Sequence, residues 1–382
     1  MQQSDRTGAK PDFGVDVMIR GSGAVQGTAV LIEQQFIELT GHMSFSLVSS
    51  YGLLSELRTQ MDLLARNVSS IGTAFATALN IASTSSSNVS ATFEPMVLAL
   101  SSLQTLQVDH LPAILAEIQS LVELPIKLEL QDSFRAIFST VQLLAGTVLQ
   151  LTSAVVNSND PANVDVSVVN MVNRAASLLR ANIVPLNYTI ASTGDNIRAV
   201  DAFLARLSSS VQSNTVTVGN DFERFLQQQY QLKNTTTAGL SCTKQEISDI
   251  GSSVAPFLPI LCDGSDPCDL QTTVEQIMQL QSDEVDQVAT TMTRQIDELA
   301  RFKPVYTAAA SELFNRTYNL GLFLADVTVI KGPYALHCFK KYSNLVEQLI
   351  PRVTDGFNVC YRQETTRLRS LRTSLLNIKV KN

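Results

Sequence analysis

The sequence predicts an all-α protein, an elongated helical bundle with coiled-coil-like packing and a disulfide-stapled C-terminal helical module. Apolar residues recur at intervals of three and four over long stretches, which is typical of amphipathic helices. No series of alternating strands follows them. All five cysteines lie after residue 241, which sets the last third of the chain apart.

The clearest helix begins near residue 54. Its apolar positions alternate strictly by three and four, which stacks them on one face for packing against another helix. We expect this helix to end in the neutral polar segment 83–88. The stripe consists of Leu54, Leu57, Met61, Leu64, Val68, Ile71 and Phe75.

Similar stripes predict helices over residues 111–122, 134–155, 168–186 and 197–211. Pro112 suits a first helical turn, whereas Pro125 is expected to stop or kink the helix. Asp132 or Ser133 is expected to cap the helix that follows.

The segment 235–239 (Thr-Thr-Thr-Ala-Gly) is interpreted as a linker or exposed turn, so we divide the chain near residue 240. The predicted parts are an N-terminal arm and first helix (1–45), a helical bundle (46–235) and a cysteine-containing helical module (240–382). The last part contains a stripe from Val285 to Phe302, ended or bent by Pro304. A final helix is expected from Ala335, kinked near Pro351.

Composition limits the function. The 382 residues include 28 Lys and Arg against 35 Asp and Glu, giving a formal charge of -7. A nucleic-acid binder concentrates basic residues to neutralise phosphates, so we expect no nucleic-acid partner. No run of about 18 apolar residues occurs, so no membrane span is predicted. The first residues lack the apolar core of a signal peptide, which indicates either a cytosolic protein or a secreted chain without its leader.

The cysteines favour the secreted alternative. Clustered cysteines and the short polar loop 262–268 are typical of disulfides in an oxidising compartment, the alternative being buried free thiols. Sequence proximity suggests pairing of Cys338 with Cys360, and of Cys262 with Cys242 or Cys268. Because five is odd, one thiol is either free or links two copies in a homodimer.

Five Asn-X-Ser/Thr sequons permit N-glycosylation, although they do not demonstrate secretion. The candidate asparagines are Asn67, Asn88, Asn187, Asn234 and Asn315.

No catalytic, metal or cofactor site is predicted. Gly21, Gly23 and Gly27 follow an apolar segment as in a phosphate-binding turn, but the parallel strands of a nucleotide-binding fold are missing, so a flexible N-terminal arm is expected. The aspartates of loop 262–268 do not match an EF-hand, so a solvated turn is favoured over a calcium site. His42, His110 and His337 are isolated in sequence.

The C-terminal tail, residues 361–382, carries six basic residues against Glu364 alone. It is expected either to contact an acidic face of its own bundle or to bind an anionic partner, such as lipid headgroups or a sulfated glycan. The candidate residues are Arg362, Arg367, Arg369 and Arg372.

The segment from Cys338 to Tyr361 begins with a cysteine and an aromatic residue, has Tyr342 one turn later and a leucine stripe, and closes with Cys360. It resembles the cysteine-bounded helical segment of the insect secreted family that includes the tsetse EP-type domain. The resemblance covers at most the last third of the chain, and Pro351 departs from the pattern. It implies a glycoprotein of insect saliva, gut or haemolymph.

We therefore expect a secreted, non-enzymatic binding glycoprotein that engages a host or microbial protein. Two alternatives remain open: a carrier of a small apolar ligand such as a lipid, and a structural protein that assembles through helix pairing.

Overall fold

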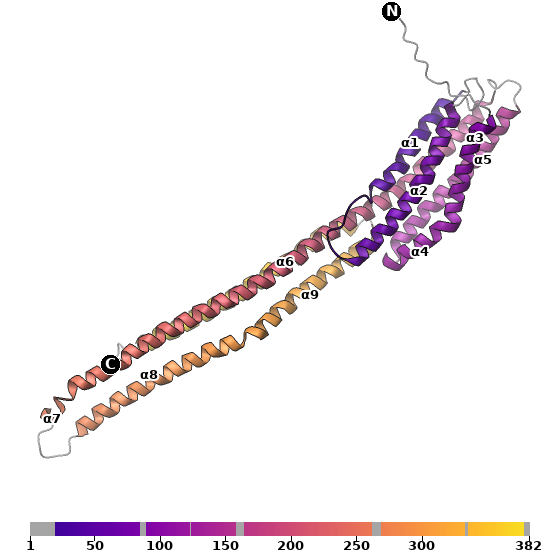
Figure 1. Cartoon of the computed structure of the whole chain (residues 1–382). Coiled ribbons are helices and arrows are strands. Elements are labelled where there is room, and N and C mark those ends of the chain that lie inside the picture. Colours follow the sequence, from indigo (N-terminus) through magenta and orange to yellow (C-terminus); the bar gives the residue numbers. More distant parts are fainter. Residues whose placement is uncertain are drawn as a thin grey trace, which may run out of the picture. The chain divides into compact units, whose positions relative to one another are not determined.

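The computed structural model describes residues 20–84, 89–122, 124–157, 164–261, 269–332 and 335–377. Within these residues the secondary structure is helical, with no strand, so the chain is all-α (Figure 1). The helices are α1 (Ser22–Gly41), α2 (Gly52–Thr84), α3 (Val89–Thr105), η1 (Leu106–His110), α4 (Leu111–Val122), α5 (Leu124–Val156), α6 (Val166–Val254), α7 (Leu258–Leu261), α8 (Asp269–Arg301), α9 (Lys303–Ile330) and α10 (Ala335–Asn377).

The chain forms two compact units. The first comprises Met1–Arg206 and Gly321–Ser343, and the second comprises Leu207–Leu320 and Asn344–Asn382. Three helices, α6, α9 and α10, contribute residues to both units. The division expected near residue 240 falls inside α6.

In the first unit, α1 packs along α2. Phe36 of α1 is fully buried, and a β-carbon at Gly72 of α2 would lie 2.5 Å from its ring. The glycine therefore allows the two helices to approach closely. The predicted stripe of α2 is buried except at Ile71, which is half-buried while Gly72 takes the interior position, and α2 ends at Thr84 as expected.

The glycine-rich N-terminal segment is more helical than predicted. Gly21 precedes α1 with a left-handed φ of 95°, whereas Gly23 and Gly27 lie inside the helix. The flexible glycine turn is thus reduced to one residue. The apolar segment 15–19 lies outside the described residues.

Helix α3 was not predicted from the sequence. This helix continues through the π-helical turn η1 into α4, where the Leu111 N–H donates to the Leu106 carbonyl. Pro112 has no N–H for an α-helical bond to Val108, and its ring would crowd that carbonyl, so the wider turn accommodates the proline without ending the helix.

The stripe predicted in α5 is buried throughout, from Phe134 to Val155. The expected caps Asp132 and Ser133 lie inside the helix, because α5 begins eight residues before Asp132, at Leu124. By length and composition alone, α5 is the one described helix that could cross a membrane, with 39% of its most apolar window buried. Core helices meet the same criterion, so the absence of a membrane span stays a prediction.

The two helices predicted over 168–186 and 197–211 are parts of the single helix α6, so the expected break is wrong. Asp165 caps its start, and the backbone N–H of Ser167, which donates to this carboxylate at 2.9 Å, holds the pKa of Asp165 below its usual value. The turn predicted at 235–239 is also helical, and Thr235 and Thr236 donate their hydroxyls back to the Leu232 carbonyl within this helix.

Candidate functional site

The second unit is built on an antiparallel helix pair. The last part of α6 runs against α8, with Lys233 paired to Asp297 at 3.7 Å and Lys244 to Asp286 at 2.6 Å. Nearer the α7 end, Met278 of α8 packs directly over Gly251 of α6. These contacts keep one register along the pair.

A third helix, α10, lies along this pair and runs parallel to α6. The hydroxyl of Thr354 donates to Asn214 at 2.9 Å, and the Gln229 amide donates to Thr365 at 3.2 Å. Residue numbers therefore increase together along the two helices.

An aromatic cluster joins α6, α9 and α10. Phe225 stacks on Tyr361 with ring centroids 5.1 Å apart, and Phe222 stacks on Tyr306 at 4.7 Å. Phe357 meets the Tyr306 ring edge-on at 4.7 Å. Burial in this cluster raises the pKa of Tyr306 to about 12 and also raises the pKa of Tyr361.

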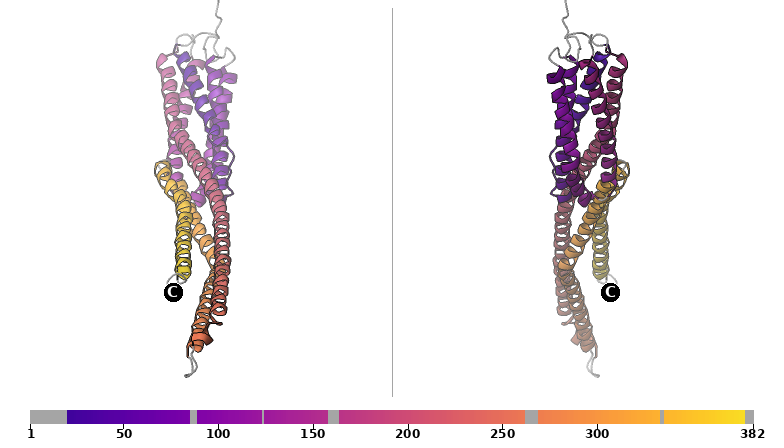
Figure 2. Two further views of the ribbon diagram at one scale, coloured as in Figure 1. Left: turned by 90° about the vertical axis from the view of Figure 1, so that its left-hand side faces the viewer. Right: turned by 90° about the vertical axis from the view of Figure 1, so that its right-hand side faces the viewer.

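Helix α10 lies along only part of the length of the α6–α8 pair. At Gln229 and Thr365 the residue numbers differ by 136, so Asn377, the end of α10, is level with about Ser241 of α6. Figure 2 shows α10 ending short of the connection at α7. Beyond this level no third helix in the described part of the chain covers residues 242–260 and 269–290, which we call the uncovered hairpin.

The uncovered hairpin has little interior. Leu258 is the one buried residue in its two segments. Six large apolar side chains are instead 42–74% exposed, and we call them the apolar hairpin face. They are Ile250, Phe257, Ile260, Leu270, Ile277 and Leu280.

The same hairpin is acidic. Its two segments contain seven carboxylates against one base, Lys244, which pairs with Asp286. The carboxylates belong to Glu246, Asp249, Asp269, Glu275, Asp283, Glu284 and Asp286. An exposed apolar surface with an acidic surround fits a partner that is both apolar and basic.

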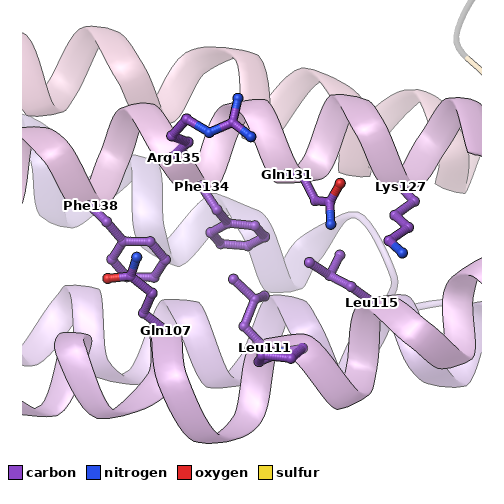
Figure 3. Close-up of a pocket in the computed structure, with 9 residues that line it drawn as sticks. Gln107, Leu111, Leu115, Lys127, Gln131, Phe134, Arg135 and Phe138 are labelled. Atoms are coloured by element: carbon purple, nitrogen blue, oxygen red, sulfur yellow. The ribbon is translucent and has the colours of Figure 1, made fainter.

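The first unit contains a different concave feature, a groove of about 400 Å³ between α4 and α5 (Figure 3). Leu111, Leu115, Phe134 and Phe138 supply its apolar wall, and each is at most 5% exposed. Lys127 and Arg135 stand at its edge, where Lys127 donates to Gln119 and Arg135 pairs with Asp132. Little apolar surface in this groove is open to a ligand.

The proposed pairing of Cys338 with Cys360 is wrong. Both thiols are free and exposed in one helix, α10, 22 residues apart. At about 1.5 Å of rise per residue they are roughly 33 Å apart, whereas the α-carbons of a disulfide lie within about 7 Å. Cys242 is also free and exposed. The expected partners Cys262 and Cys268 lie outside the described residues, so the described part of the C-terminal module contains no disulfide staple.

The glycosylation candidates differ in accessibility. Asn234 and Asn315 are exposed, and Asn67 is half-buried. Asn187 is held on both sides of its amide, accepting from His42 at 2.6 Å and donating to Glu38 at 3.2 Å. Asn88 lies outside the described residues.

The four candidate arginines are not equivalent. Arg362 and Arg369 are exposed, seven residues apart on one helix face. Arg367 donates to both oxygens of Glu364, at 2.7 and 2.9 Å, and this contact holds the pKa of Glu364 below its usual value. Arg372 is half-buried. Of the four candidates, Arg362 and Arg369 are thus exposed without such a contact to Glu364.

The three histidines lie on separate elements: His42 follows α1, His110 is in η1 and His337 is in α10. Among the described residues, no group of three His, Cys, Asp or Glu side chains is placed to hold a metal ion. Asp263 and Asp266 of the loop weighed for calcium fall outside them.

The apolar hairpin face was not predicted from the sequence. Leu270 and Ile277 are seven residues apart, as are Ile250 and Phe257, so a heptad signal was present. Exposure was not predictable, because the same spacing describes a buried stripe whenever a third helix covers it.

Comparison with known proteins gives no relative: no family model, curated protein or solved structure matches this chain.

Proposed function

We propose that the chain is a secreted, non-enzymatic interaction glycoprotein that binds a protein partner through the apolar hairpin face. In this proposal its helices form an elongated bundle with coiled-coil-like packing, and the second unit presents the binding surface. Its origin in an insect secretion rests on the C-terminal resemblance alone.

The observation that carries the proposal is the concentration of six exposed apolar side chains on one hairpin. Single exposed apolar residues are ordinary, whereas several exposed apolar residues on one short helix pair favour an interaction surface. A helix pair with almost no buried residue also gains stability when a partner covers it. The free, exposed Cys242, which is not one of these six residues, gives a covalent homodimer a route that leaves the apolar hairpin face to the partner.

A photo-crosslinking experiment tests this function. A benzoylphenylalanine placed at Leu280 of the full chain should give a discrete protein adduct in the fluid from which the protein is isolated. The matched control is Val216, an equally apolar position on α6 that is 63% exposed. Adduct formation at Leu280 should disappear in the Phe257→Ser variant.

Equal adducts at residues 280 and 216, or adducts that survive Phe257→Ser, would contradict the function. A concentration-dependent oligomer in sedimentation, crosslinked only to itself, would favour the structural-assembly alternative instead.

The groove between α4 and α5 supports the carrier alternative, because its apolar wall and two basic edge residues match a small amphipathic anion. Organic extraction of the native protein followed by mass spectrometry should recover a stoichiometric lipid if this function is correct. The burial of the wall makes this the second candidate.

A further inference from the structure

We infer that the partner segment is a basic amphipathic helix that takes the place of a third helix beyond the end of α10. This inference rests on the function proposed above and specifies the chemistry of the partner. It follows from the register of the three helices, the direction of the exposed residues and the charge of the hairpin.

The register defines the length of the vacant position. The cover by α10 ends level with about Ser241, whereas α6 continues to Val254. From Ser241 to Val254 is 13 residues, or about 20 Å of helix at 1.5 Å per residue. A partner helix of about four turns covers this length.

The exposed Ile250 of α6 points toward this position. In packed helices, residues seven apart keep the same direction toward a neighbour. Ile250 is three heptads after Gln229, whose side chain contacts Thr365 of α10. Ile250 thus continues the row that faces α10, and the exposed Phe257 follows in the turn after α6 ends at Val254.

The exposed residues of α8 behave in the same way. Glu298 and Arg301 line a groove together with Glu364 and Arg367 of α10. Ile277 and Leu280 are three heptads before Glu298 and Arg301, respectively, and Leu270 is one heptad before Ile277. The apolar hairpin face therefore lies along the continuation of the α10 position.

The charge of the uncovered hairpin favours one kind of partner for the apolar hairpin face over the others. The uncovered hairpin carries seven carboxylates and one base, so a helix with Lys or Arg beside its apolar stripe is attracted. An anionic membrane is repelled by the same charge. A second copy of the hairpin would bring two acidic surfaces together, which is also unfavourable.

The test uses the full chain and two labelled 18-residue helical peptides with the same leucine stripe, one flanked by lysines and the other by glutamates. Fluorescence anisotropy should show the lysine peptide binding at least about tenfold more tightly. The variant Ile277→Ser/Leu280→Ser should lose this binding, while Val216→Ser, an exposed apolar control, should retain it. The variant Asp283→Lys/Glu284→Lys should weaken the lysine peptide and strengthen the glutamate peptide.

Equal affinity for the two peptides, or binding that is unchanged by Ile277→Ser/Leu280→Ser, would overturn the inference. So would tighter binding to phosphatidylserine vesicles, or a dimer abolished by Leu280→Ser. The two proposals fail separately: a Leu280 crosslink to a protein without peptide discrimination refutes the basic-helix inference alone, whereas loss of the crosslink refutes the interaction function.

Discussion

Phe36 of α1 lies against the bare backbone of Gly72 in α2, where a β-carbon would be 2.5 Å from three atoms of the ring. The ring is fully buried and is not the free end of a flexible chain, so it has no simple way to move. This contact fixes how closely the first two helices pack.

Gly72→Ala is therefore expected to destabilise the first unit. Overpacking costs about 1–3 kcal/mol, which at this rigid contact exceeds the gain of up to about 1 kcal/mol from replacing a helical glycine with alanine. The matched control is Gly146→Ala in α5, where a β-carbon meets nothing within 4 Å and a small stabilisation is expected. Urea unfolding of both variants measures the difference, and equal effects would contradict the close approach.

Asp201 of α6 is expected to be essential for the segment before α2. Its buried carboxylate accepts the backbone N–H groups of Val48 and Ser49, both at 2.8 Å. Asp201→Ala leaves two donors without their acceptor and should cost about 1–3 kcal/mol. Asp201→Asn keeps one acceptor oxygen and should lose less, as measured by the free energy of unfolding. If the two variants are equal, the carboxylate does not hold this segment in the way described.

Most helices were predicted from the sequence because their apolar stripes are strictly periodic. Helix α6, however, was predicted as two helices, separated where the residues are weak helix formers. Between residues 187 and 196 the chain is rich in Ser, Thr, Asn and Gly. Tertiary contacts keep it helical. Asn196 is buried and donates to the Gly332 carbonyl at 2.8 Å, and Gly194 allows the His42 carbonyl to approach. Such long-range partners have no signature in local propensity.

The apolar hairpin face was harder to predict than the fold. The sequence indicated apolar rows in α6 and α8, but whether a row is buried depends on where α10 ends relative to them. That register is set by contacts such as Gln229 with Thr365, which join residues 136 positions apart.

The disulfide was predicted wrongly because sequence proximity does not show the structure of the intervening chain. Cys338 and Cys360 suggested a short closed loop, whereas the intervening chain is one continuous helix.

The second unit should lose stability at alkaline pH. Burial raises the pKa of Tyr306 to about 12, above the value of about 10 for an unfolded tyrosine. Because the raised pKa favours the protonated form in the folded state, its stabilising contribution is complete below pH 10 and is lost as pH rises from 10 to 12. Absorbance at 295 nm should show Tyr306 and Tyr361 ionising after the other tyrosines. Tyr306→Phe should remove one late step, and ionisation of all tyrosines near pH 10 would contradict the burial.

The accessible sequons should carry the glycans. Asn315 and Asn234 are exposed, whereas Asn187 is held by His42 and Glu38. A glycan at Asn187 would have to break both contacts, since it would replace an amide hydrogen and add bulk between α1 and α6. Peptide mass spectrometry after deglycosylation in heavy-oxygen water should mark Asn315 and Asn234 but not Asn187. Full occupancy of Asn187 would contradict the packing there.

The three described cysteines should react as free thiols. Cys242, Cys338 and Cys360 are exposed, and the helix between the last two keeps them far apart. Alkylation of the native protein should therefore label Cys338 and Cys360, and the Cys338→Ser/Cys360→Ser variant should unfold at the same temperature as the parent chain. An intramolecular disulfide would instead protect both thiols and make the melting temperature sensitive to reductant. A helix cannot bring two residues 22 positions apart into contact without breaking its backbone hydrogen bonds. Protection of this pair would therefore require α10 to unfold in its middle. The helical circular dichroism signal of the oxidised protein would then decrease.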